Sequence, residues 1–162
     1  MVKMGDIVAA MIEYYSNDVR RVNHFLKVYS FAKSIGEREQ ITTECQEILE
    51  IAAITHDIGI REGERLYQSS SGEYQQKLGP KEARKLLQPF EISESVIERV
   101  CYLIAHHHTY HLIEGMDYQI LIEADFLVNA FEDELDKQAI HSFRDRIFKT
   151  GTGKAFLEQL YG

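Results

Sequence analysis

The spacing of apolar side chains predicts a chain built mainly of helices. Apolar residues recur at three- and four-residue intervals along long segments, and only two prolines interrupt them. The helices predicted from this pattern cover residues 6–15, 18–35, 43–58, 80–88, 93–108, 118–132, 137–149 and 153–161. We therefore predict an all-α fold, a helical bundle that forms a single domain over residues 1–162.

Glycines mark several of the predicted helix ends. Gly36 and Gly59 are expected to end the second and third helices, and Gly79-Pro80 to open the fourth. Residues 60–78 form the longest stretch without periodicity. Two interpretations stay open for it: a lid over a site that begins at the preceding helix end, or a solvated linker.

Composition and charge exclude some classes of function. The formal net charge is −8, and the lysines and arginines are scattered, so no basic face for a nucleic-acid polymer is expected, although a nucleotide substrate stays open. No apolar run reaches about 18 residues, which argues against a membrane span. The beginning of the chain does not resemble a signal peptide, and Cys45 and Cys101 fit reduced thiols in helices. We expect a cytoplasmic protein.

Three predicted helices each place a metal-ligand type of residue on an apolar stripe. The run from Ile51 to Ile60 contains adjacent His56 and Asp57, while His24 and Asp125 occupy apolar faces of two other helices. Singly, each of these residues is more typical of a hydrogen-bonded core group. Together they would be costly to bury, and a divalent cation held by two imidazoles and two carboxylates would stabilise all four.

The order and flanks of these residues resemble a known family. His24, then Ala52-Ala53-Ile54-Thr55-His56-Asp57-Ile58-Gly59, then Glu123-Ala124-Asp125 resembles the H…HD…D motif of the HD-domain metal-dependent phosphohydrolase superfamily. The resemblance implies an all-α bundle in which His24, His56, Asp57 and Asp125 bind one divalent ion. Mn, Co, Ni, Fe, Zn and Mg all remain candidates.

The resemblance also implies further site residues. Some relatives hold a second metal through extra histidines, for which His107 fits best here and His106 is a companion, whereas His108 and His111 are expected in a loop or at the surface. The chain has no histidine in the segment 77–80, where dinuclear relatives carry one. A lysine that often follows the HD pair is replaced by Ile60, so its phosphate-binding role would pass to Arg61 or be lost. Arg21 is another candidate for phosphate contact.

The expected function is hydrolysis of a small phosphorylated molecule, with a nucleotide as the preferred substrate. Asp57, His107 and Arg61 are the expected catalytic residues. Two alternatives stay open: an HD-fold di-iron oxygenase, and a metal-binding regulatory domain without catalysis. Apolar residues in the last helices leave a homodimer open as well. The sequence names neither the substrate nor the metal.

Overall fold

The computed structural model describes residues 2–162, and every regular element in that range is an α-helix. The helices are α1 (Met4–Tyr14), α2 (Val19–Arg38), α3 (Thr43–Thr55), α4 (Gly59–Tyr67), α5 (Gly72–Leu87), α6 (Glu94–His106), α7 (Met116–Glu132), α8 (Lys137–Ile147) and α9 (Gly151–Tyr161). The predicted all-α fold class is confirmed. Among the described residues, no helix has both the length and the apolar character needed to cross a membrane.

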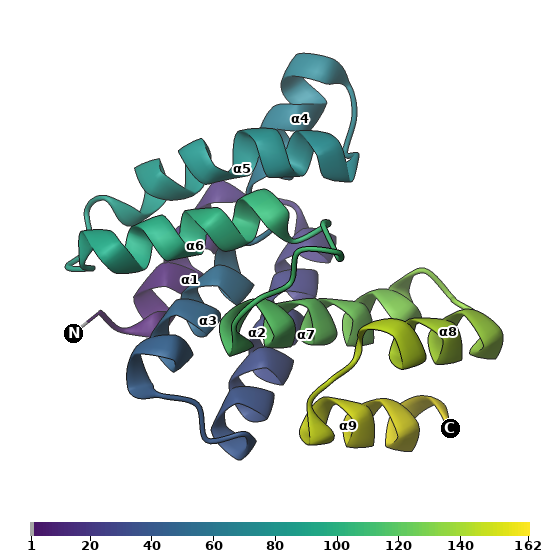
Figure 1. Ribbon diagram of the computed structural model, residues 1–162. Coiled ribbons are helices and arrows are strands. Elements are labelled where there is room, and N and C mark those ends of the chain that lie inside the picture. Colours follow the sequence, from purple (N-terminus) through teal and green to yellow (C-terminus); the bar gives the residue numbers. More distant parts are fainter. Residues whose placement is uncertain (1) are drawn as a thin grey trace.

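The three helices α2, α3 and α7 form the centre of the fold (Figure 1). Helix α2 packs against both α3 and α7, and α3 also packs against α6. Helices α5 and α6 lie side by side above this centre, α4 contacts α5, and α8 and α9 lie beyond α7 at the C-terminal end. The helices that carry or directly precede the predicted ligands thus all pack against one another.

Polar side chains fix where several helices begin. Asp18 caps α2 by accepting a hydrogen bond from the backbone N–H of Arg21, and Thr42 caps α3 through the N–H of Cys45. Ser93 caps α6 in the same way. Each cap satisfies a backbone donor that the first helical turn leaves free.

Residues 60–78 were expected to lack regular structure, and this prediction is wrong. It forms α4 and the first half of α5, joined by a short turn in which Gln68 has a positive φ of 55°. The buried stripe of α4 consists of Gly59, Ile60 and Gly63, so it carries little of the apolar periodicity on which the prediction rested. Pro80 lies inside α5 and does not open it.

Gly59 and Gly79 allow a close contact between α4 and α5. A Cβ atom on Gly59 would lie 2.8 Å from the backbone nitrogen of Gly79 and 2.7 Å from the carbonyl oxygen of Gln75. Gly36 likewise lies inside α2, where a Cβ would meet the side chain of Gln46 at 2.3 Å. The helix ends predicted at Gly36 and Gly79 were therefore wrong, because both residues lie inside helices and are required for packing. Helix α3 ends at Thr55, before the predicted Gly59, which is the first residue of α4.

Candidate metal centre

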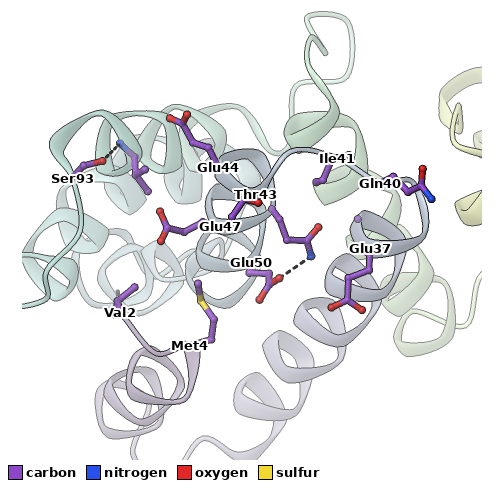
Figure 2. A pocket seen from close by; sticks show the side chains of 13 residues that line it. Val2, Met4, Glu37, Gln40, Ile41, Thr43, Glu44, Glu47, Glu50 and Ser93 are labelled. Atoms are coloured by element: carbon purple, nitrogen blue, oxygen red, sulfur yellow. Dashed lines mark hydrogen bonds between the residues drawn. The ribbon is translucent and has the colours of Figure 1, made fainter.

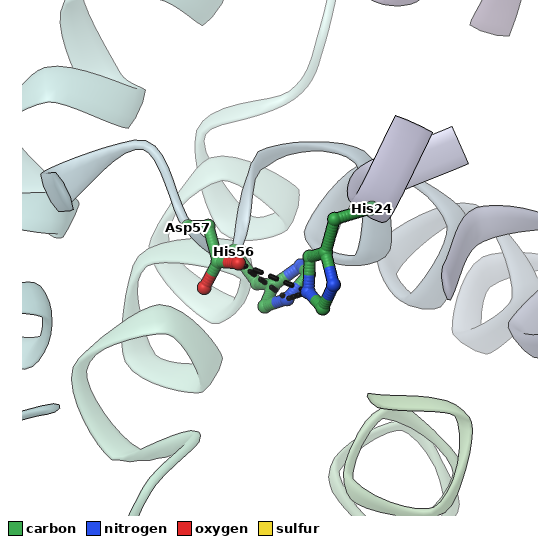
Figure 3. A group of neighbouring side chains, drawn as sticks. All are labelled: His24, His56 and Asp57. Carbon is green, nitrogen blue, oxygen red and sulfur yellow. Dashed lines mark hydrogen bonds and ion pairs between the residues drawn. The ribbon is translucent and has the colours of Figure 1, made fainter. Parts of the chain in front are cut away.

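The four predicted ligands meet at one point between α2, the turn after α3, and α7. Nε2 of His24 lies 3.0 Å from Oδ2 of Asp57 and 3.2 Å from Oδ1 of Asp125. Nε2 of His56 lies 3.4 Å from Oδ2 of Asp57 and 3.2 Å from Oδ1 of Asp125. Figure 3 shows His24, His56 and Asp57 directed toward one another. Ligand atoms of these three residues all lie within 4.8 Å of one another.

The backbone around His56 and Asp57 is held from two sides. His56 is the C-cap of α3, and its Nδ1 lies 2.8 Å from the carbonyl oxygen of Ala53. The hydroxyl of Tyr15, the C-cap of α1, donates a hydrogen bond of 2.6 Å to the carbonyl oxygen of Asp57. These contacts orient the imidazole of His56 so that Nε2 faces the other ligands.

His24 is oriented by a carboxylate outside the group of four. Its Nδ1 lies 2.7 Å from Oε1 of Glu132, whose other oxygen lies 3.8 Å from Nζ of Lys27. Both imidazoles therefore have a partner for Nδ1 that leaves Nε2 directed at the centre. This is the arrangement of histidines that bind metal through Nε2 and donate their other N–H to an acceptor. The donor set accordingly fits a divalent ion.

The close approach of the histidines and carboxylates shifts their pKa values. Burial lowers the pKa of His24, but the hydrogen bonds and charges of Asp125 and Asp57 outweigh burial and raise it to about 11. Burial raises the pKa of Asp57 and of Asp125, yet the nearby histidines outweigh it and hold both carboxyl pKa values below their usual range. Without a cation, the carboxylates are therefore balanced by protons on the imidazoles.

A second donor group adjoins the first and shares Asp57. Nε2 of His107 lies 3.5 Å from Oδ1 of Asp57, and ligand atoms of Asp57, His107 and His108 lie within 4.8 Å of one another. The amide of Gln75 lies within this group, with Oε1 at 3.1 Å from Nε2 of His107 and 2.7 Å from Nε2 of His108. His108, expected in a loop or at the surface, is thus part of this group.

Two predicted site residues are not brought to the centre. Arg61 donates a hydrogen bond of 2.9 Å to the carbonyl oxygen of Tyr14, and its guanidinium lies over the Tyr14 ring. His106 stacks on Tyr102, and its Nδ1 lies 2.8 Å from the Tyr102 carbonyl oxygen. The chain geometry therefore directs both side chains away from His24 and Asp125. His111 is exposed, as expected.

A pocket of about 520 Å³ opens onto the ligands. Its lining includes His24, Asp57 and Asp125. The other lining residues lie on or next to α2, α4, α5, α6 and α7, namely Asp18, Arg20, Arg21, Ile60, Ser70, Gln75, His108, Asn129, Glu132 and Asp133. Arg21 is paired with Asp18 and Glu64, whereas Arg20 is exposed and has no ion pair among the described residues. A small substrate could reach the ligands through this pocket.

A larger groove of about 750 Å³ lies at the opposite ends of α2 and α3 (Figure 2). Val2 and Met4 lie on one side of it, and Glu44, Glu47 and Glu50 extend from α3. Glu50 accepts a hydrogen bond of 2.7 Å from Gln46. The residues that line the groove include no histidine or cysteine. The groove is larger, but only the smaller pocket combines histidines with carboxylates, so the smaller pocket is the candidate functional site.

Three contributors to the centre were missed in the sequence. Glu132 had a readable signal, because it follows Asp125 by seven residues, two helical turns along the same face of α7. Gln75 and Tyr15 had none: Gln75 lies in the stretch without periodicity, and Tyr15 contacts only the backbone of Asp57.

The helices and the His/Asp group together define an all-α protein built around a site suited to a divalent metal. The chain belongs to the HD-domain family, whose sequence profile matches residues 21–144. HD domains bind divalent metal ions, and the described residues include His/Asp groups that could hold one.

The fold also matches a solved structure, described as a predicted HD superfamily hydrolase from an uncultured Thermotogales bacterium. The two chains are 23% identical with a TM-score of 0.66, and the match covers 95% of this chain and 82% of the other. Curated proteins gave no match. The similarity to the solved structure supports the fold.

Proposed function

We propose that this protein is a metal-dependent phosphohydrolase that acts on a small phosphorylated substrate, with a nucleotide as the preferred class. The observation that carries the proposal is the convergence of His24, His56, Asp57 and Asp125 at the base of an open pocket. HD-family membership agrees with this reading. The pocket volume of about 520 Å³ is in the usual range for small-molecule sites.

His24, His56, Asp57 and Asp125 would hold the divalent ion. When bound, the ion supplies a Lewis acid that lowers the pKa of a water molecule and stabilises negative charge on a phosphoryl oxygen. Glu132 and the Ala53 carbonyl would keep the two imidazoles oriented, since each already contacts an Nδ1 atom.

Asp57 is the residue proposed to handle the proton of the attacking water. In the metal-free protein its pKa is held below the usual range, so the side chain is a carboxylate at neutral pH and presents two acceptor oxygens. Water would attack phosphorus as the bond from phosphorus to the ester oxygen breaks, and Oδ1 of Asp57 would receive a proton from that water. His107, 3.5 Å from Oδ1, would stabilise Asp57 and pass the proton to the departing ester oxygen, which leaves as a hydroxyl group.

Arg20 and Arg21 are the proposed phosphate contacts. Both line the pocket, and guanidinium groups pair with phosphate oxygens through two hydrogen bonds. Arg20 is the stronger candidate, because Arg21 would have to exchange its pairs with Asp18 and Glu64 for the substrate. The lysine position of the family motif is occupied by Ile60, which lines the same pocket and offers no charge.

A substrate screen tests the proposal. Nucleoside monophosphates, nucleoside triphosphates and a generic phosphate ester would be incubated with purified protein and Mn²⁺, Co²⁺, Ni²⁺ or Mg²⁺, and released phosphate would be measured. We expect turnover of at least one ester that stops on addition of a chelator. If no metal supports turnover of any ester, a binding or regulatory domain becomes the better interpretation.

The metal content of the purified protein distinguishes a phosphohydrolase from a di-iron oxygenase. A di-iron oxygenase would need two irons per chain and therefore a complete second donor group. Asp57, His107 and His108 lie close enough to contribute to one, but Gln75 occupies the position from which another strong ligand would come. Protein purified without added metal and containing two irons per chain would favour the oxygenase.

A further inference from the structure

The amide of Gln75 is buried at the centre of the second donor group. The residue is 8% exposed, and its Oε1 contacts Nε2 of His107 and Nε2 of His108 at 3.1 Å and 2.7 Å. These are the nitrogens that His107 and His108 would have to present to a metal ion bound with Asp57. Gln75 therefore competes directly with a second ion for the same atoms.

Other contacts fix which end of the Gln75 amide faces the histidines. Its Nε2 donates a hydrogen bond of 2.8 Å to the carbonyl oxygen of Ser70. The oxygen is consequently the atom that faces His108, and it accepts a hydrogen bond from Nε2–H of that residue. A ring nitrogen that donates its hydrogen has no lone pair for a metal ion.

His108 is also held on its other sides. Its backbone N–H donates to Oε1 of Gln76 at 2.9 Å, and the same oxygen accepts from the hydroxyl of Thr109 at 3.0 Å. The ring lies against Gly72, where a Cβ atom would be 2.9 Å from it. His108 thus cannot swing toward Asp57 without losing these contacts or moving α5.

We propose that Gln75 limits this protein to one tightly bound metal ion. A neutral carboxamide oxygen binds Fe²⁺, Co²⁺, Ni²⁺ or Zn²⁺ less strongly than an imidazole does, and it lacks the negative charge with which a carboxylate binds Mn²⁺. With Gln75 in place, the second group offers the shared Asp57 and His107 but no third strong ligand. The inference rests on the proposed metal centre, because a limit of one ion requires that the first site binds an ion.

The substitutions Gln75→Glu and Gln75→His test this inference, because each replaces the amide with a strong metal ligand. The full-length protein would be loaded with excess Mn²⁺, passed over a desalting column, and analysed for Mn²⁺ per chain. Electron paramagnetic resonance would detect the coupling of two neighbouring Mn²⁺ ions. Gln76→Glu, one residue along and directed at the backbone of His108, is the matched control for added charge.

We expect one ion per chain in the unmodified protein and in Gln76→Glu, and two coupled ions in at least one Gln75 variant. The Kd for the second ion should fall by about tenfold or more in that variant. Two ions in the unmodified protein would overturn the inference and leave the metal centre standing. No ion in the unmodified protein would overturn both.

One ion in each Gln75 variant that keeps its helical circular dichroism would also overturn the inference. Glu and His differ in shape and charge, so the failure of one variant to fold leaves the other as the test. The number of Mn²⁺ ions bound per chain of the unmodified protein is a separate test that depends on no variant.

Discussion

Nε2 of His24 lies 3.0 Å from Oδ2 of Asp57, although the residues come from different helical segments, α2 and the turn after α3. The contact exists because α2 and α3 pack against each other and because Tyr15 and Ala53 fix the turn. The packing of these segments therefore sets the geometry of the ligands.

Asp57→Ala is expected to lower metal-dependent turnover by at least about 100-fold. The substitution removes both a proposed ligand and the proposed proton acceptor. Phosphate release with the best metal measures the effect, and circular dichroism checks that the helices persist. Asp145→Ala, exposed on α8, is the control and should retain full activity. Full activity in Asp57→Ala would rule out the proposed mechanism.

Glu132→Gln is expected to weaken metal binding by about 10- to 100-fold with little change in folding. Glu132 contacts Nδ1 of His24, and residues in that position orient a ligand without touching the metal. Isothermal titration with Mn²⁺ measures the change in Kd. Glu134→Gln removes an equal charge at an exposed position two residues along and should have no effect. Equal Kd values for the two variants would contradict the role assigned to Glu132.

Tyr15→Phe is expected to cost about 1 kcal/mol of unfolding free energy and to reduce activity as well. The hydroxyl donates to the Asp57 carbonyl, and without it a part-buried acceptor loses its partner. Urea unfolding measures the first effect and phosphate release the second. Tyr67→Phe changes an exposed ring and serves as the control. A variant with lower stability and unchanged kcat would show that the hydroxyl only supports the fold.

Arg20→Ala is expected to raise KM by about tenfold with a smaller change in kcat. Arg20 lines the pocket and lacks an ion pair among residues 2–162, so it is available to a phosphate group. Initial-rate kinetics across substrate concentrations separate the two constants. Arg38→Ala, exposed at the far end of α2, is the control. An unchanged KM in Arg20→Ala would remove Arg20 from the proposal.

Metal removal should make stability depend on pH in the alkaline range. The pKa of His24 is raised to about 11, from about 6.5 in an unfolded chain, so its contribution is fully present below pH 6.5 and is lost as the pH rises toward 11. The pKa values of Asp57 and Asp125 are lowered, so their contribution is present above about pH 4 and is lost at lower pH. The metal-free protein should therefore be most stable between about pH 4 and 6.5.

Urea unfolding between pH 4 and 9, with chelator or with Mn²⁺, measures this dependence. With metal bound, the ion replaces the protons on the imidazoles, and stability should not fall between pH 7 and 9. A flat profile for the metal-free protein over the same range would contradict the protonation described for His24.

Much of the fold was readable from the sequence, because the helices that hold the ligands have strong apolar stripes. His24, His56 and Asp125 were expected to point inward because each shares a face with apolar residues, and all three are buried. The stretch from Gly59 to Leu78 was not readable, because α4 buries two glycines and the start of α5 buries a glutamine. Where two helices pack through glycines, the sequence shows no apolar periodicity from which the helices could be predicted.

The surroundings of the ligands were harder to predict than the ligands themselves. Arg61 followed the HD pair closely in sequence, but the turn into α4 directs it at Tyr14. His106 and His107 are adjacent, yet helical geometry sends one toward Tyr102 and the other toward Asp57. Which neighbour of a motif reaches a site depends on local backbone direction, and spacing alone does not give it.

A crystal structure of protein loaded with Mn²⁺, with the ion identified by anomalous scattering, tests the proposed metal centre most directly. We predict an anomalous peak bounded by Nε2 of His24, Nε2 of His56 and the carboxylates of Asp57 and Asp125. The absence of a peak among these atoms at saturating Mn²⁺, or a peak only at some other position, would contradict it.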